Sequence, residues 1–482
     1  MPKLYIGVDI GTSVTKGAVI DERGHLITQC SADRCRRVIS SNVHEHDPDS
    51  IWWDEFCCVV RSILRALGGK SRHLETVAVT GMVPNICVLN VRGKPLHKAL
   101  LYYDGRALSI ERQLDHDLRT GPWQNEALSK IIWLRKKLSD EWAKASRILS
   151  THNYIGWRLT DRFYADRITA MEYGNLFDAD NSEWNRKILG RYQLSPSLFP
   201  ELVDPSTIIG VVHKRASGLS GLPAGLPVAA GTSDTISTFL GAGVHSKGDL
   251  LIYYGTYTCA ATLLEDIEAV LRTKLTSYPI RWVASIPRGG QQLCSIASSL
   301  FHSTRVGNSI ARLEREALGS GPGANGVTFI QTARLPNVDN STEPDGAIVN
   351  LRLSNTRADI CRAVLEAFGY GLKWCFQSLG YCPIPSRCFA AGGGARSALW
   401  KQIVSDITGL DQRYFPHADR AYGSAVLSAL SDRIDILPEI QRLQSATSHH
   451  VKPSESGTDL YARTFSKYGE FIARYNPPSR AG

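Results

Sequence analysis

The sequence has little excess charge of either sign and no long hydrophobic run. Its 482 residues include 55 basic and 46 acidic side chains, a formal net charge of +9 that is too small and scattered to indicate a nucleic-acid-binding protein. The most apolar stretch, residues 76–91, is shorter than a bilayer span and is interrupted by Gly81, Pro84 and Asn85. We therefore expect neither a nucleic-acid nor a membrane partner.

The 11 cysteines contain no CxxC pair, so neither structural zinc nor a thioredoxin-type redox motif is expected. Their odd number and scattered spacing favour reduced thiols in a cytoplasmic protein. The first residues, MPKLYIGVDIG, lead directly into a strand-like segment, and we expect no signal peptide. At roughly 100–200 residues per domain, this length predicts two to four domains. Together these features favour an enzyme that acts on anionic small molecules.

One local pattern occurs in both halves of the chain. Residues 3–29 predict a hairpin around a Gly/Ser/Thr turn, followed by a third strand. Residues 249–264, DLLIYYGTYTCAATLL, again show a strand, a Gly-Thr turn and a strand, which indicates an internal duplication. Because no low-complexity linker is present, we expect an α/β protein of two domains, 1–245 and 246–482, with an interdomain cleft as the active site.

Hydrophobic periodicity places further elements. Helical spacing predicts helices over 50–67, with Ser50 as the cap, and over 235–243, 354–379 and 395–409. Strands are predicted in 74–82, 227–231 and 387–394, and a hairpin in 86–103. The tail, residues 476–482, is predicted to be disordered.

The turn that follows Asp9 has the composition of a phosphate-binding loop. In DIGTSVTK, residues 9–16, a carboxylate at a strand end is followed by hydroxyls, backbone amides and Lys16. Converging N–H and O–H donors can hold phosphate oxygens, and Asp9 could hold Mg²⁺, partly through water. The spacing is not that of a Walker A loop. An ordinary Gly-Thr hairpin turn accounts for this motif alone about equally well.

Two further turns belong to the second half of the chain. Gly255-Thr256 repeats the strand–turn device, although a plain hairpin is the simpler interpretation of that pair alone. Gly392-Gly393-Gly394 lies between a predicted strand and a predicted helix, where glycines allow close backbone approach to an anionic or polar ligand. Ser397 can cap that helix or contact a base.

Two carboxylates are candidates for binding or activating hydroxyl groups. Asp234, at the start of a predicted helix, can accept a proton from a hydroxyl that attacks phosphorus, or it can simply cap the helix. Asp104 and Arg106, on a turn after a strand, can bind neighbouring hydroxyls, or form a local surface ion pair. The residues His44–Asp47, together with Asp166 and Asp178, are interpreted as surface loops.

With these residues in view, the chain resembles the FGGY carbohydrate kinase family over nearly its whole length, and within it the xylulokinases. The N-terminal YIGVDIGTSVTKGAVID resembles the family's first phosphate motif, and KIIWLRKK (130–137) its Lys-x-x-Trp signature. DRFYADRITAMEYGNLFDADNSEWN (161–185) is similar to a segment that contains Leu-Phe-Asp. FAAGGGARSALWKQIVSDITGLDQRYF (389–415) resembles the adenosine motif, and AYGSAVLSAL (421–430) the helix after it.

The resemblance implies two actin-like, ribonuclease H-like ATPase domains, with ATP and Mg²⁺ as cofactors and a small sugar or polyol as substrate. Asp234 would be the catalytic base and Asp9 the Mg²⁺ ligand. The remaining implied positions are Thr12, Ser13, Lys16 and Thr256 near the phosphates, Gly393, Gly394 and Ser397 near the nucleotide, and Met82, Asp104 and Arg106 near the sugar.

Departures from the family pattern fall on the sugar side. Val83-Pro84-Asn85 stands where many relatives have His-Gly after the methionine, and Tyr103 stands where Trp is usual. The run Gly-Thr-Ser-Asp-Thr at 231–235 replaces a Gly-Gly-x-Asp-Asn-like run. D-xylulose is the first expected substrate, and a ribulokinase or another sugar or polyol kinase is the alternative. From other classes, an actin-like ATPase switch and a regulatory sugar-binding protein stay open. The oligomeric state is open too, with a homodimer as one option.

Overall fold

The computed structural model describes residues 2–33, 43–121, 124–255, 257–286, 289–301, 306–331, 346–380 and 385–475. The chain forms two compact units, each assembled from three segments. Unit 1 consists of Met1–His245, Glu265–Pro279 and His417–Ala446, and unit 2 consists of Ser246–Leu264, Ile280–Pro416 and Thr447–Gly482. The chain first leaves unit 1 between residues 245 and 246, where the sequence predicts a boundary, but two later segments return to it.

The two units share one strand order. Unit 1 contains a seven-stranded sheet, in which three consecutive antiparallel strands are followed by a parallel neighbour of the first strand. Its strands are, in sheet order, β13 (Ile208–Val211), β14 (Pro227–Ala229), β5 (Leu74–Gly81), β1 (Leu4–Ile10), β2 (Val14–Asp21) and β3 (Leu26–Asp33), with β15 (Thr232–Ser233) paired to β5.

Unit 2 repeats this arrangement in its own six-stranded sheet, whose order is β18 (Ile280–Ile286), β17 (Thr258–Leu263), β16 (Leu250–Tyr254), β21 (Cys388–Ala391), β22 (Gln412–Tyr414) and β23 (His449–Val451). Here too the first strand, β16, pairs antiparallel with the second and parallel with the fourth, β21. The repeated order confirms the predicted duplication and the ribonuclease H-like topology of both halves.

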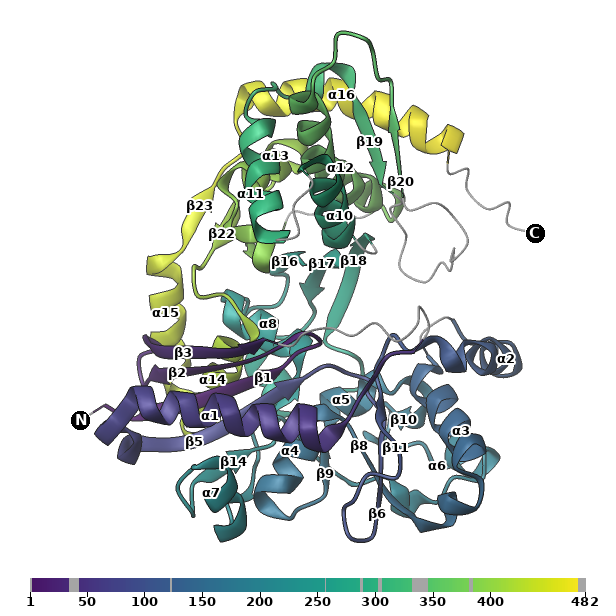
Figure 1. Cartoon of the computed structure of the whole chain (residues 1–482), viewed down its shortest axis with the longest axis vertical. Coiled ribbons are helices and arrows are strands. Elements are labelled where there is room, and N and C mark those ends of the chain that lie inside the picture. The colour runs from purple at the N-terminus through teal and green to yellow at the C-terminus, as the bar shows by residue number, and fades with distance from the viewer. Residues whose placement is uncertain are drawn as a thin grey trace. The chain divides into compact units, whose positions relative to one another are not determined.

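Helices cover both faces of the unit 1 sheet because small residues on β1 and β2 let them approach (Figure 1). A Cβ atom at Gly7 of β1 would lie 2.0 Å from the backbone nitrogen of Ala425, in α14 (Arg420–Asp432). A Cβ atom at Gly17 of β2 would lie 2.6 Å from side chains of α1 (Asp54–Leu67). Gly7 therefore faces α14, and Gly17, which pairs with Val8, faces α1.

Helix α8 (Asp234–Ala242) packs closely against α14 within unit 1. A Cβ atom at Gly423 would lie only 1.8 Å from the backbone oxygen of Ser237, and one at Gly241 would lie 2.3 Å from the backbone oxygen of Asp419. Only glycine permits this backbone approach. The two helices are thus held together at the end where α14 begins.

The rest of unit 1 surrounds this core with short helices and two-stranded sheets. Its helices are α2 (Leu108–Leu118), α3 (Glu126–Leu138), α4 (Thr151–Thr160), α5 (Arg167–Glu172), α6 (Arg186–Arg191), α7 (Lys214–Ser220), α9 (Ile267–Arg272) and α15 (Leu437–Thr447). Its strand pairs are β4 (Glu45–His46) with β7 (Ala99–Leu100), β6 (Cys87–Asn90) with β8 (Ala145–Leu149), β9 (Tyr164–Asp166) with β12 (Glu201–Val203), and β10 (Phe177–Asp178) with β11 (Glu183–Trp184).

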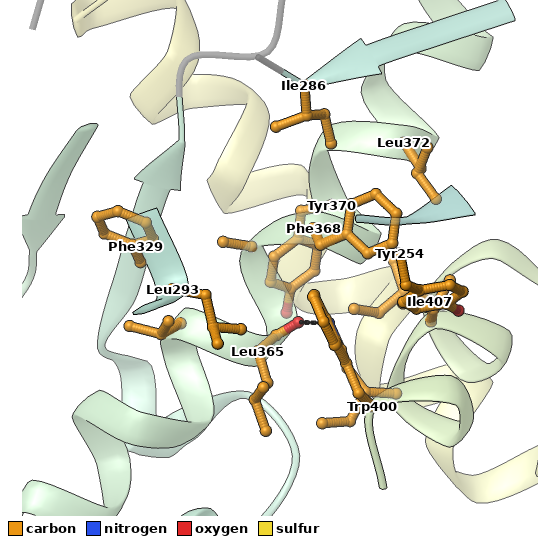
Figure 2. Packing of buried hydrophobic residues seen from close by; sticks show 14 of the residues in the cluster. Tyr254, Ile286, Leu293, Phe329, Leu365, Phe368, Tyr370, Leu372, Trp400 and Ile407 are labelled. Atoms are coloured by element: carbon orange, nitrogen blue, oxygen red, sulfur yellow. Dashed lines mark hydrogen bonds between the residues drawn. The ribbon is translucent and has the colours of Figure 1, made fainter. Parts of the chain in front are cut away.

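Unit 2 is organised around a group of three aromatic side chains. Tyr254 of β16, Phe368 of α12 (Arg357–Ser378) and Trp400 of α13 (Ala398–Thr408) pack edge to face, with ring centroids 5.1–5.5 Å apart. The Trp400 indole N–H donates to the backbone oxygen of Leu365 at 3.0 Å (Figure 2). Edge-to-face contacts and a satisfied indole hold both helices against the first strand of the sheet. The remaining elements are α10 (Gly289–Phe301), α11 (Val306–Ala317), α16 (Glu455–Tyr475) and the pair β19 (Thr328–Gln331)–β20 (Gly346–Val349).

Several local predictions differ from the structure. Ser50 does not cap the helix over 50–67, because a π turn (Pro48–Trp53) precedes α1 and the carboxylate of Asp47 accepts from the backbone N–H groups of Asp49 and Ser50. The predicted hairpin in 86–103 forms only in part, since β6 pairs mainly with β8. The predicted tail at 476–482 lies outside the described residues.

Candidate functional site

Carboxylates of unit 1 gather where β1 ends and α14 begins. Asp9 follows Gly7 by two positions on a strand, so its side chain points to the same face and toward the first turn of α14. Burial raises the pKa of Asp9 to about 7, with Arg420 opposing the shift and the nearby charges of Asp234 and Asp419 adding to it. A strand end, α8 and α14 thus bring together acidic side chains from three distant parts of the sequence.

Asp234 is held by an ion pair across α8 and α14. Its Oδ2 atom lies 2.9 Å from Nη1 of Arg420, and 16% of its side chain is exposed. The Nε atom of Arg420 also donates to the hydroxyl of Thr238 at 3.3 Å. Asp234 does not cap α8: it is the first helical residue, and the cap is Ser233. The carboxylate is therefore fixed by a cation while part of its surface stays accessible.

The β1–β2 turn presents hydroxyls and one lysine beside this group. Lys16 Nζ lies 3.6 Å from the carboxylate of Asp419, which also accepts from the side-chain amide of Gln29. The hydroxyl of Thr12 lies 2.8 Å from the sulfur of Met82. Ser13 is half-buried at the tip of the turn. Lys16, with 36% of its side chain exposed, remains within reach of solvent.

The Asp9 carboxylate fits a cation-binding role. Its Oδ1 atom is buried and has no hydrogen-bond partner among the residues that the structure describes. A buried carboxylate oxygen without a donor is costly, and a hard divalent cation such as Mg²⁺ is the ligand that this oxygen type prefers. The chemistry of this oxygen therefore fits Mg²⁺.

The turn at 103–106 contains an ion pair between Asp104, whose side chain is buried, and Arg106, whose side chain is mostly buried. The Asp104 side chain has no exposed surface and accepts from the guanidinium of Arg106 through Nε and Nη2, both at 2.9 Å. It also accepts from the backbone N–H of His44 at 2.7 Å. Arg106 bonds the carboxylate of Glu45 at 2.8 Å and stacks on Trp133 at 4.7 Å. This turn is rigid, and Arg106 is the member of the pair that reaches solvent, with 19% of its side chain exposed.

Lys130 and Glu126 on α3 hold the chain just before the same turn. The Lys130 ammonium is buried and donates to the backbone oxygen of Tyr102 at 2.8 Å and to Glu126 at 2.7 Å. A buried lysine paired with a carboxylate and a carbonyl is a structural anchor. The Lys-x-x-Trp signature thus has a physical explanation, since Lys130 fixes Tyr102 and Trp133 lies beneath Arg106.

A buried dyad supports the strand that leads to Asp234. His152 Nε2 lies 2.7 Å from the carboxylate of Asp166, and neither side chain is exposed. Asp166 also accepts from the hydroxyl of Thr232 at 3.2 Å, two residues before Asp234, and caps α5 through the N–H of Thr169. The surface-loop interpretation of Asp166 is therefore wrong, because the dyad is part of the packing between α4, β9 and β15.

In unit 2, the glycine run lies next to the end of β16. A Cβ atom at Gly392 would lie 2.6 Å from the backbone oxygen of Tyr254, and one at Gly394 would lie 2.3 Å from the ring of Trp400. At Gly393 an added Cβ would have no neighbour within 4 Å. The Ser397 hydroxyl caps α13 by accepting from the N–H of Trp400 at 3.0 Å. Gly392 and Gly394 are therefore required by close packing, whereas the backbone at Gly393 has no protein atoms over it.

The structure brings together some of the predicted residues and adds others. Within unit 1, Asp9, Lys16 and Asp234 share one group of charges. Within unit 2, Gly393, Gly394 and Ser397 share one turn, and Thr256 lies outside the described residues. Sequence reasoning missed Glu45, Glu172, Tyr278, Asp419 and Arg420. The only sequence signal for Arg420 is its position directly before the AYGSAVLSAL helix.

Two kinds of feature are absent from the part of the chain that the structure describes. No helix there is long and apolar enough to cross a membrane. No group of three or more His, Cys, Asp or Glu side chains with the geometry of a metal site occurs there either. The surface-loop interpretation of His44–Asp47 is also wrong, because β4 pairs there with β7 and His46 is buried. Glu45 accepts from Arg106, and the Trp52 indole donates to His46 at 3.1 Å.

Comparison with known proteins gives a consistent result. The N-terminal domain of the FGGY family of carbohydrate kinases matches residues 4–241, and the C-terminal domain of that family matches residues 296–431. The chain is 24% identical to a xylulose kinase from Klebsiella pneumoniae, over 96% of this chain and 99% of that protein. It is also 24% identical to a gluconokinase from Bacillus licheniformis, over 95% and 94%.

A solved structure agrees with the observed fold. The chain superposes on a xylulose kinase from Rhodospirillum rubrum with a TM-score of 0.80 and 23% identity, covering 98% of this chain and 99% of that one. At this identity the likeness establishes the two-unit fold and leaves the substrate open. The identity of the sugar substrate therefore depends on the residues of the site.

Proposed function

Because the chain belongs to the FGGY family of carbohydrate kinases, we propose that it transfers the terminal phosphoryl group of ATP to a primary hydroxyl of a ketose or polyol, with D-xylulose, giving D-xylulose 5-phosphate, as the first acceptor. The observation that carries this proposal is the Asp234 carboxylate, which is held by Arg420, is partly exposed and lies within electrostatic reach of Asp9. A kinase needs one such carboxylate near the attacking hydroxyl.

Asp234 orients the acceptor hydroxyl and receives its proton as the oxygen attacks phosphorus. The ion pair with Arg420 fixes the carboxylate in one direction, so that it meets the acceptor hydroxyl in a single orientation. A fixed orientation and acceptance of the proton together define its role, in keeping with phosphoryl transfer, where positioning and electrostatics dominate.

The β1–β2 turn is assigned to the phosphates. Thr12 and Ser13 offer hydroxyls and backbone amides, and Lys16 offers a partly exposed ammonium. Asp9, with its unpartnered buried oxygen, is assigned to Mg²⁺. When bound, Mg²⁺–ATP supplies the phosphoryl group and neutralises its charge.

The glycine turn of unit 2 is assigned to the nucleotide. The open position at Gly393 allows a ligand to approach the backbone, and Gly394 is held in place by Trp400. Ser397 is occupied as a helix cap, so its contribution is to fix the start of α13. Thr256 keeps its sequence-based assignment to the phosphates.

The charges near Asp234 favour a neutral acceptor over a sugar acid. Arg420 is paired with Asp234 and Lys16 with Asp419, and Arg106 is shared between Asp104 and Glu45. A carboxylate substrate would have to compete with these partners and would meet the acidic group at the end of β1. We therefore assign Met82 and the Arg106 turn to binding a neutral sugar or polyol.

A coupled ATP assay over a panel of acceptors tests the proposal. D-xylulose, D-ribulose, glycerol and D-gluconate are compared at equal concentration with purified protein, Mg²⁺ and ATP. The proposal expects ATP consumption that rises with a neutral ketose or polyol, and product phosphorylated on a primary hydroxyl. A flat response across the panel would contradict it and would favour an ATPase switch. A preference for D-gluconate would contradict the neutral acceptor.

A further inference from the structure

Next to Asp234, unit 1 carries a second carboxyl group that the proposed chemistry does not use. Glu172 is the last residue of α5, and its Oε1 atom accepts from the hydroxyl of Tyr278 at 2.8 Å. Tyr278 belongs to the segment Glu265–Pro279, which returns to unit 1 after the first strands of unit 2. Both residues are half-buried.

The pair lies within electrostatic reach of Asp234. Helix α5 contacts β15, whose last residue, Ser233, directly precedes Asp234. Burial raises the pKa of Glu172 to about 8, with the hydrogen bond from Tyr278 opposing the shift and the charge of Asp234 adding to it. Burial likewise raises the pKa of the Tyr278 hydroxyl well above its usual value, with added effects of Glu172 and Asp234.

The physical consequence is a neutral, partly exposed hydrogen-bonding pair beside a charged one. Near neutral pH, Glu172 carries its proton, so the pair has both donor and acceptor capacity. A neutral donor–acceptor pair suits a sugar hydroxyl, which also both donates and accepts. Asp234, held by Arg420, acts on one hydroxyl of the sugar. The next hydroxyl is on the neighbouring carbon atom, so a second hydrogen-bonding group close to Asp234 can bind it.

We propose, on the basis of the proposed function, that Glu172 and Tyr278 form a second part of the acceptor-binding site. This pair hydrogen-bonds the sugar hydroxyl next to the one that Asp234 deprotonates. The two residues would then determine which acceptors are used. The competing role is purely structural: the Tyr278–Glu172 bond would only fasten the segment Glu265–Pro279 to α5.

The test pairs protein variants with a modified acceptor. Tyr278→Phe and Glu172→Gln are compared with wild type and with the control Glu183→Gln, an exposed glutamate on β11. The acceptors are D-xylulose, or the fastest ketose of the panel, and its analogue that lacks the hydroxyl next to the accepting one. Values of kcat/KM for each acceptor, KM for ATP and Tm are measured for every protein.

In the wild type and the control, we expect the deoxy analogue to be poorer by roughly tenfold, the effect of one lost hydrogen bond in a polar site. In Tyr278→Phe, we expect the parent acceptor to lose about the same factor, so that the ratio of the two acceptors falls to near one. Glu172→Gln, which keeps the size and the polarity, should reduce that ratio less. KM for ATP should stay within about twofold, because neither residue belongs to the β1–β2 turn or to the glycine turn, to which the phosphates and the nucleotide are assigned.

Two results would overturn this inference while the kinase function stands. One is an unchanged acceptor ratio in Tyr278→Phe together with a lower Tm, which is the structural outcome. The other is an unchanged ratio with an unchanged Tm, which would mean that the pair touches no acceptor. If instead wild-type protein uses no acceptor of the panel, the proposed function fails and the inference falls with it. Should Tyr278→Phe fail to fold, the ratio in Glu172→Gln decides.

Discussion

Replacement of Asp234 by asparagine should separate its catalytic role from its structural one. Asparagine keeps the size of the side chain and an oxygen that can accept from Arg420, but it cannot take up a proton. A positioned base contributes about 10²–10⁴-fold to the rate, which corresponds to roughly 3–5 kcal/mol of activation free energy. The ion pair with Arg420 is partly exposed and contributes only ~1 kcal/mol to the free energy of unfolding. The loss of rate should therefore far exceed any loss of folded protein.

The assay is the coupled measurement of acceptor-dependent ATP consumption, with nucleotide binding measured by calorimetry and Tm by thermal unfolding. We expect kcat to fall by about 10²–10⁴-fold, the affinity for ATP to stay nearly unchanged and Tm to shift little. Asp204→Asn is the matched control, because Asp204 is also a partly exposed aspartate of unit 1 paired with an arginine, Arg167, at 3.2 Å. A kcat within about threefold of wild type in Asp234→Asn would refute the assignment, since a base cannot be dispensable.

Three further predictions follow from the packing and charges. Gly423→Ala should lower the free energy of unfolding by about 3 kcal/mol, because the added Cβ would overlap the backbone of Ser237. Gly190→Ala is the control, since a Cβ atom there has no neighbour within 4 Å. Equal Tm values for the two variants would be inconsistent with this packing. Glu172→Gln should stabilise the protein increasingly as pH rises from about 5 to about 8, and the gain should level off above that. Burial raises the pKa of Glu172 to about 8 in the folded protein only, so over this interval the unfolded wild type ionises while the folded wild type keeps its proton, and wild type loses stability. A difference in Tm independent of pH would argue against this. Gly393→Ala should leave Tm unchanged yet raise KM for ATP severalfold, since its Cβ has no protein neighbour; an unchanged KM would remove the glycine turn from the nucleotide site.

Much of the local structure could be predicted because the spacing of apolar residues over a few neighbouring positions determines it. Alternating and continuous apolar runs around Gly-Thr turns identified both hairpins, β1–β2 and β16–β17. Helical spacing identified α12 and α13. Ser50 was misassigned because Asp47, three residues earlier, competes as a cap and a π turn intervenes.

Long-range assembly could not be predicted in the same way. Helical periodicity shows that residues 421–430 form a helix with an apolar face, but it does not say which sheet that face covers. The structure places α14 on the β1 face of unit 1, although it follows the whole of the unit 2 sheet except β23 in sequence. The segment Glu265–Pro279 likewise returns to unit 1. Because the chain returns twice to unit 1, each unit contains three separate segments and not one continuous half of the sequence.

The same limitation explains which site residues were missed. Asp9 and Asp234 stand at the ends of strands, where a motif can be recognised from neighbours in the sequence, whereas Arg420 and Glu172 acquire their roles only through packing. The distance between Asp234 and Arg420 is set by how closely α8 and α14 approach, and that approach requires glycine at positions 241 and 423. Glycines that carry no chemistry thus determine the geometry of the one ion pair on which the proposed chemistry depends. A substitution that separates these helices should therefore reduce the rate even where the protein remains folded.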